Sequence, residues 1–180
     1  SIASIDITIP SGEEKTELAV TPEKLEKGKS VLSQAVSAHG GLASFKKINS
    51  IKSKGTLTVV VPQGEFAMSV DAVNVFPDKS REEATVMGQK MLTIRNGSSG
   101  WQTGPQGELV AMSEAELVDN DKDNLRNTIR IFQQSDAPAY QTVYDGSGEI
   151  DGTPVEFVVL LDKDGENICR LALDSKSHKL

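Results

Sequence analysis

Apolar and polar residues alternate with a period of two through the middle of the chain, which predicts antiparallel strands. Between residues 51 and 61, Leu57, Val59 and Val61 alternate with neighbours such as Thr56 and Thr58. A break at residues 62–64 leads into a second alternating run, which predicts a hairpin. Two more strands are predicted at residues 81–87 and 90–94. The dipeptide at 96–97, Asn-Gly, is a strong hairpin signal and predicts a further turn before the strand that carries the only tryptophan.

The pattern changes to helical spacing in two places. Thr21 is suited to cap a helix that begins at Pro22 and ends at a Gly-Gly pair at residues 40–41. Its apolar side is predicted to hold Leu25, Val31, Leu32, Ala35 and Val36. A second helix is predicted after the capping box of Ser113 and Glu116, and the polar run 120–124 is expected to divide it in two.

The rest of the chain returns to strands, at residues 140–144, 155–161 and 168–173. At the N-terminus, residues 5–9 alternate as in a short strand, and a polar, proline-bounded stretch follows them. The pattern therefore predicts an α+β fold. Residues 1–20 are predicted to be an extension and linker, and residues 21–180 to be one folded domain.

Composition removes several classes of function. The net charge is −7 and aromatic residues make up 4% of the chain, so a concentrated basic surface for nucleic acid is not expected. No apolar run has the roughly 20 residues that a membrane helix needs. Seven lysines between residues 22 and 54 leave open a peripheral contact with an anionic membrane or an acidic partner. The alternative is the ordinary solvated side of a helix. These lysines are Lys24, Lys27, Lys29, Lys46, Lys47, Lys52 and Lys54.

No catalytic, cofactor or metal site is predicted. Cys169, the only cysteine, lies in a strand-like run and reads as an inert buried thiol. The two histidines have no metal-ligand companion at helical spacing; His39 is expected to bond a free carbonyl at a helix end. The acidic run at residues 119–123 resembles the start of a calcium loop, but Asn124 and Arg130 stand where the loop needs glycine and glutamate.

The remaining candidate site is apolar. Seven side chains on the predicted meander are candidates to line the inner side of a curved sheet: Leu57, Val59, Phe66, Met68, Met87, Met91 and Trp101. One interpretation is a filled core. The other is a groove for an acyl chain or an extended peptide, in which flexible methionines adapt to the ligand.

Seven short motifs follow one another along the chain. They are the helix end at residues 38–42, the strand at 51–61, the corner at 76–79 with Arg81, the turn and tryptophan at 96–101, the capped helix from Ser113, the turn at 148–152 and the segment 173–180. From Thr21 to Leu180 this order resembles the LolA/LolB-like lipoprotein-carrier superfamily. The linker followed by TPEKLEKGKSVLSQAVSAHGG also resembles domains found after the catalytic modules of bacterial insulinase-like zinc peptidases.

The resemblance implies a strongly curved antiparallel sheet, an unclosed half-barrel, with covering helices over a hydrophobic cavity, in the periplasm or cell envelope. It implies a non-catalytic domain that binds an acyl chain, a lipoprotein-like ligand or an extended partner segment. The second hypothesis is an accessory domain attached covalently to a zinc peptidase module. The His-x-x-Glu-His motif of those peptidases is absent from this sequence, so any protease activity would belong to another module.

Overall fold

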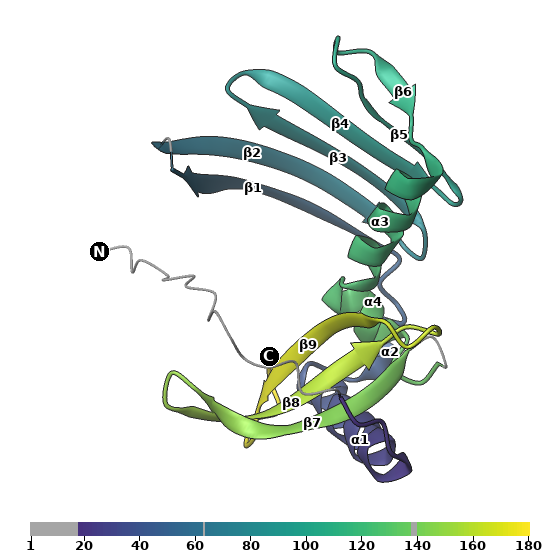
Figure 1. Ribbon diagram of the computed structural model, residues 1–180, viewed down its shortest axis with the longest axis vertical. Coiled ribbons are helices and arrows are strands. Elements are labelled where there is room, and N and C mark those ends of the chain that lie inside the picture. The colour runs from purple at the N-terminus through teal and green to yellow at the C-terminus, as the bar shows by residue number, and fades with distance from the viewer. Residues whose placement is uncertain (1–17, 63, 138–139) are drawn as a thin grey trace.

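A computed structural model describes residues 18–62, 64–137 and 140–180 of the chain. Within these residues the fold is α+β, with two antiparallel sheets that do not close into a barrel (Figure 1). The α+β class and the unclosed antiparallel sheet predicted from the sequence are confirmed. The strand predicted at residues 5–9 lies outside the described residues.

The larger sheet is a meander of six strands in chain order. Each strand pairs with the next because short turns connect them; most of these turns contain glycine, and Phe76, Pro77 and Asp78 join β2 to β3. The strands are β1 (Ser50–Val61), β2 (Gly64–Val75), β3 (Lys79–Val86), β4 (Gln89–Asn96), β5 (Ser99–Thr103) and β6 (Leu109–Ala111).

The smaller sheet joins three strands, again in chain order. They are β7 (Gln141–Ile150), β8 (Thr153–Leu161) and β9 (Asn167–Asp174). The first strand is longer than the sequence pattern predicts, because it continues through a register shift between Tyr144 and Ser147. A β-bulge of this kind lets a glycine-containing segment stay in the ladder.

Four helices complete the described fold: α1 (Pro22–Ala38), α2 (Leu42–Phe45), α3 (Glu114–Leu125) and α4 (Thr128–Gln133). The predicted caps are confirmed: Thr21 accepts from the Lys24 amide, and Ser113 and Glu116 form the capping box. The predicted break within residues 120–124 is wrong, since α3 continues to Leu125. The chain divides at Arg126 and Asn127, because the Asn127 side chain caps α4 by accepting from the Ile129 and Arg130 amides.

The main core lies between the helices and the smaller sheet. Val31, Leu32, Ala35 and Val36 of α1 are buried there, as their spacing predicts. They meet Ile131 and Phe132 of α4 and the buried side chains of β8 and β9, including Val158, Leu160 and Leu173. Gly28 allows α1 to approach β7 closely, because a Cβ at this position would lie 2.8 Å from the Tyr144 amide nitrogen.

The six-stranded sheet takes little part in this core. Of its apolar side chains, only those of Ala72 and Ala84 are buried among the described residues. Figure 1 shows α3 crossing one end of the strands, while the other ends of β1 to β4 extend beyond it. The fold therefore leaves much of one sheet without a covering layer in the described part of the chain.

Candidate functional site

The side of the six-stranded sheet that carries α3, called here the inner face, is the candidate site. The register fixes which residues belong to it, since directly paired residues share a face. Arg95 identifies this side, because its guanidinium is paired with Asp121 of α3. The amide of Gln102, also on this side, donates to Glu116 of the same helix.

Polarity along the inner face changes in steps from the strand tips towards α3. Four successive cross-strand rows show the change. The first is Leu57, Met68, Val86 and, at its β4 end, the polar Gln89; the second is Gly55, Val70, Ala84 and Met91; the third is Ser53, Ala72, Glu82 and Thr93; the fourth is Ile51, Asn74, Ser80 and Arg95. Beyond the first row, Val59 pairs with Phe66. The tip half is thus almost wholly apolar, and the helix half is mixed to polar.

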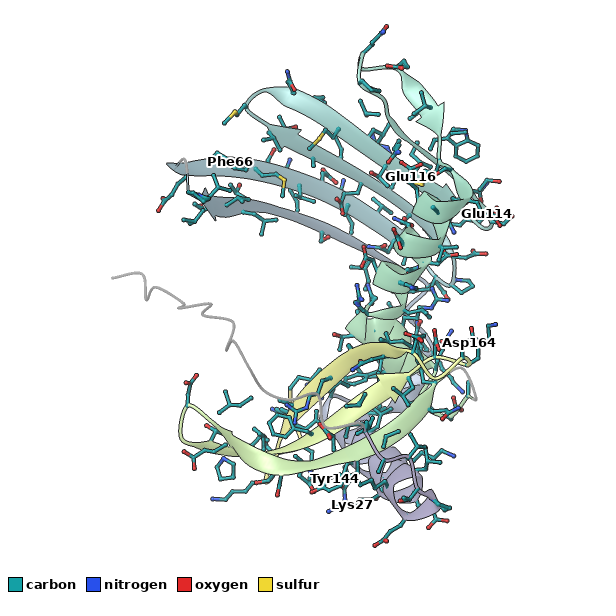
Figure 2. All side chains as sticks on the ribbon, viewed as in Figure 1. Lys27, Phe66, Glu114, Glu116, Tyr144 and Asp164 are labelled. Carbon is teal, nitrogen blue, oxygen red and sulfur yellow. The ribbon has the colours of Figure 1, made fainter. Side chains whose placement is uncertain are left out.

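The apolar half of the inner face is substantially open to solvent. Leu57 is 53% exposed and Met91 is 46% exposed, while Val59, Phe66 and Met68 are partly buried. Figure 2 places Phe66 near the strand tips and Glu116 on α3 at the opposite end. Large apolar side chains gathered on an exposed surface are typical of a binding site.

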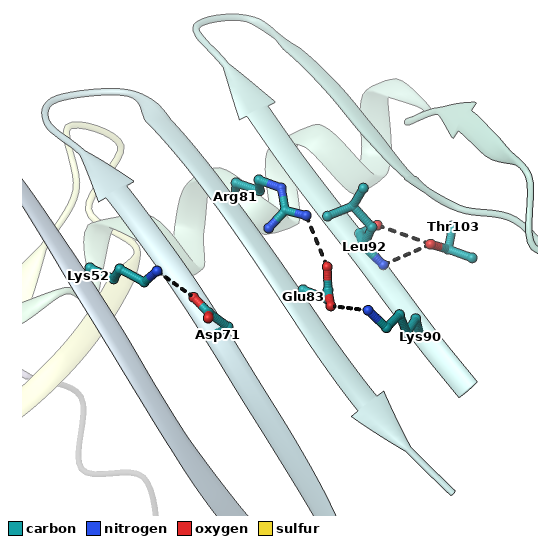
Figure 3. A network of polar contacts seen from close by, with 7 residues as sticks. All are labelled: Lys52, Asp71, Arg81, Glu83, Lys90, Leu92 and Thr103. Atoms are coloured by element: carbon teal, nitrogen blue, oxygen red, sulfur yellow. Dashed lines mark hydrogen bonds and ion pairs between the residues drawn. The ribbon is translucent and has the colours of Figure 1, made fainter. Parts of the chain in front are cut away.

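The opposite, outer face carries most of the charged side chains of the strands, and several of them form ion pairs (Figure 3). It also carries apolar residues, among them Val73, Ile94 and Trp101. Lys52 and Asp71 form an ion pair of 3.8 Å across β1 and β2. The Glu83 carboxylate accepts from Lys90 at 2.8 Å and from Arg81 at 3.0 Å. The bond to Lys90, with that to Arg81 second, holds the pKa of Glu83 below its usual range. This face carries the charged alternates of the strand pattern.

The structure brings five of the seven predicted site residues together. Leu57, Val59, Phe66, Met68 and Met91 all lie on the inner face. Met87 lies in the turn between β3 and β4 and is 81% exposed. Trp101 pairs with Ile94 and Ala111 on the outer face. The same geometry adds Val61, Val70, Val86 and Val110 to the inner set.

Two cavities open along the inner face. One, of about 900 Å³, lies where Met91 and Val110 meet Gln102 and the loop between β5 and β6. The other, of about 370 Å³, is a polar cleft between the sheet and the junction of α3 and α4. A cavity of either volume accommodates a small ligand or part of a larger one.

Arg95 and the asparagines of α3 are functional candidates that the sequence reading did not single out. Arg95 has a buried Nη1 with no hydrogen-bond partner among the described residues. Asn120 and Asn124 lie four residues apart on one side of α3, and Asn127, the N-cap of α4, lines the same cleft. That spacing is a readable signal, whereas the burial of Arg95 depends on tertiary packing.

Titratable groups elsewhere have structural roles. Burial raises the pKa of the Cys169 thiol, as an inert strand cysteine requires. The His39 ring contacts the Ala35 carbonyl oxygen at 2.8 Å from Nδ1, so the predicted helix-end hydrogen bond is confirmed.

Over the described ranges, no three His, Cys, Asp or Glu side chains are grouped to hold a metal ion. No helix in those ranges is both long and apolar enough to cross a membrane.

No model of a known protein family matches the chain, and no curated protein matches it. Solved structures do. A DUF1329 family protein from Desulfovibrio piger has 11% identity and a TM-score of 0.48, over 86% of this chain and 75% of that one. A putative outer membrane lipoprotein-sorting protein domain from Vibrio parahaemolyticus has 13% identity and a TM-score of 0.42, over 85% and 74%.

LprF from Mycobacterium bovis has 13% identity and a TM-score of 0.27, over 75% of this chain and 64% of that one. None of these three is described as part of a peptidase. At such scores the similarities do not identify a ligand, so the inner face itself supplies the evidence for function.

Proposed function

We propose that this chain is a non-catalytic domain of the cell envelope that binds an acyl chain on the inner face of its six-stranded sheet. The observation that supports the proposal most directly is the group of large apolar side chains on the tip half of the inner face. Leu57, Phe66 and Met68 point to the same side as α3, and no described element covers their end of the sheet. Burying such side chains under a ligand removes apolar surface from water, which contributes a favourable free energy of roughly 25 cal/mol per Å² of buried surface.

The tip half of the outer face offers no equivalent surface, since Thr58, Ser69 and Thr85 lie there. The central positions of the outer face carry Lys52, Asp71 and Glu83, which are held in ion pairs across the strands. An acyl chain laid over them would leave charged groups desolvated, which is costly. Two methionines on the inner face, Met68 and Met91, are flexible and adapt to chains of different shape.

Displacement of an uncharged apolar dye, N-phenyl-1-naphthylamine, by 1-monolauroylglycerol tests the proposal. We expect saturable binding that Met68→Asp weakens by about tenfold or more, because a carboxylate enters the apolar row. Ser69→Asp is the matched control, since Ser69 is the next residue of β2, on the outer face, and exposed. Loss of binding in both variants, or in neither, contradicts an inner-face site. Displacement by extended apolar peptides alone would favour a partner segment as the ligand.

Attachment of this domain to a zinc peptidase module stays a prediction, because no contact in the described residues tests it. The reading frame that encodes the chain provides the test. A His-x-x-Glu-His module encoded in the same reading frame supports attachment to a zinc peptidase, and its absence removes the hypothesis.

A further inference from the structure

The polar cleft between the six-stranded sheet and the α3–α4 junction has a ligand preference of its own. The sheet contributes Ala72, Asn74, Ser80, Arg81, Glu82 and Thr93 to its lining, and the helical segment contributes Asn120, Asp123, Asn124 and Asn127. Four amides and two hydroxyls dominate this lining. Amide side chains both donate and accept hydrogen bonds without carrying charge. The lining therefore matches an uncharged group rich in hydroxyls.

The charges around the cleft point in the same direction. Arg81 is turned to Glu83 on the outer face, Arg95 is paired with Asp121, and Arg126 is paired with Asp123 at 2.6 Å. Each of these three cations thus already has a carboxylate partner, and the remaining unpartnered guanidinium nitrogen, Nη1 of Arg95, is buried.

Glu82 differs from these residues. No ion pair joins it to another residue in the described part of the chain. An anionic group in the cleft would meet this unneutralised carboxylate, while Arg81 in the lining is already paired with Glu83, so the two like charges would repel.

The cleft is continuous with the apolar half of the inner face. Asn74, Ala72, Val70 and Met68 succeed one another on the inner side of β2, from the cleft towards the strand tips. At about 3.3 Å per residue, the distance from Asn74 to Phe66 along the strand is roughly 26 Å. Gly55, beside Val70, has no side chain, and a Cβ there would meet no atom within 4 Å. A single chain can therefore run along the strands from a polar end to an apolar end.

We propose that the inner face binds its ligand in one orientation, with an uncharged, hydroxyl-bearing head group in the cleft and the acyl chain along β2 towards Phe66. This proposal rests on the proposed function and adds the class of head group. Glu82 is the specificity-determining residue: it accepts hydrogen bonds from hydroxyls and excludes anions. Asn120 and Asn124 are positioned to hold the head from the helix side.

Three ligands with the same twelve-carbon chain test the proposal, each used below its critical micelle concentration. They are 1-monolauroylglycerol, dodecyl phosphate and dodecylamine, titrated against N-phenyl-1-naphthylamine. We expect the glycerol head to bind at least about tenfold more tightly than the phosphate head. Glu82→Gln should strengthen dodecyl phosphate binding several-fold and change 1-monolauroylglycerol binding by a smaller factor, because the Gln side-chain oxygen still accepts hydrogen bonds from hydroxyls. Glu65→Gln removes the same charge from the outer face of β2 and should change neither affinity.

The outcomes separate the two proposals. Equal affinities for all three heads, unchanged by Glu82→Gln, overturn the head-group assignment and leave acyl-chain binding intact. Tighter binding of dodecylamine than of 1-monolauroylglycerol overturns the assignment of an uncharged head. Failure of every twelve-carbon ligand to displace the dye overturns the proposed function and this inference together.

Discussion

Arg95 and Asp121 join the six-stranded sheet to α3 through an ion pair whose two ends differ in environment. The Arg95 side chain is 4% exposed, whereas the Asp121 side chain is 60% exposed. Gly100, directly opposite Arg95, has no side chain and leaves room for the guanidinium stem. The helix is thus attached to the sheet by a cation buried on one element and an anion presented by the other.

Removing the Asp121 carboxylate should therefore lower the free energy of unfolding more than removing a carboxylate from an ion pair that is exposed at both ends. We expect Asp121→Ala to lower the free energy of unfolding by about 1–3 kcal/mol, because a buried cation then loses its partner. Asp123→Ala is the control on the same helix, where the pair with Arg126 is exposed on both sides and worth less than about 1 kcal/mol. Urea unfolding followed by circular dichroism measures both. Equal effects of the two changes would contradict a special role for Arg95.

Gly28 gives a second prediction, about the packing of α1 on β7. Helix propensity alone predicts that Gly28→Ala stabilises α1 by about 1 kcal/mol. The close approach of Thr142 and Tyr144 predicts the opposite, a loss of about 1–3 kcal/mol, since the helix must move away from the strand. Ser30→Ala, at an exposed position of α1, should be neutral or slightly stabilising. A stabilised Gly28→Ala variant in urea unfolding would show that the helix does not pack this closely.

Glu116 gives a prediction about pH. Hydrogen bonds from the Ser113 hydroxyl and amide, both at 2.7 Å, hold its pKa below the usual value of 4.5. A lowered pKa in the folded state means that the carboxylate contributes stability above pH 4.5. This contribution is lost as the pH falls through the folded-state pKa. The urea midpoint of Glu116→Gln should therefore fall less on acidification than that of the unchanged protein.

Two measurements check this interpretation of Glu116. The amide proton of Ser113 should shift in NMR spectra with a midpoint below pH 4.5, because it donates to the titrating carboxylate. Glu114→Gln serves as the control, since Glu114 lies in the same first turn of α3 but outside the capping box. The Ser113 amide should still titrate in this variant. A Ser113 amide that does not titrate in this range would show that the capping box is open in solution.

The local elements were predictable because their signals are local. Thr21 and Pro22 begin a helix through their own hydrogen-bonding and backbone preferences, and the dipeptide at 96–97 closes a hairpin in the same way. The break predicted within residues 120–124 does not occur, because polar residues alone do not end a helix. Asn127 begins the next helix because its side chain caps the new first turn.

The face of the sheet on which each residue lies depends, in addition, on the register between neighbouring strands. The hairpin pairs Asn96 with Ser99, so odd-numbered residues of β4 lie opposite even-numbered residues of β5. Met91 and Trp101 consequently point to opposite sides, although both are large and apolar. Burial of a tryptophan is a property of the residue type, whereas its face depends on the turn. Arg95 and Asp121 could not be paired from the sequence at all, because that contact depends on where α3 crosses the sheet.

This difference of face yields the last prediction. Trp101 lies on the outer face beside Ile94 and Ala111, so its fluorescence should not respond when 1-monolauroylglycerol binds to the inner face. A tryptophan placed at Met91, with Trp101→Phe to remove the native signal, should respond with a blue shift. Met91 lies on the inner face and lines the larger cavity, where a bound chain replaces water around the indole. The ligand role predicted for Trp101 from the sequence requires a different result, a fluorescence shift in the unchanged protein when 1-monolauroylglycerol binds.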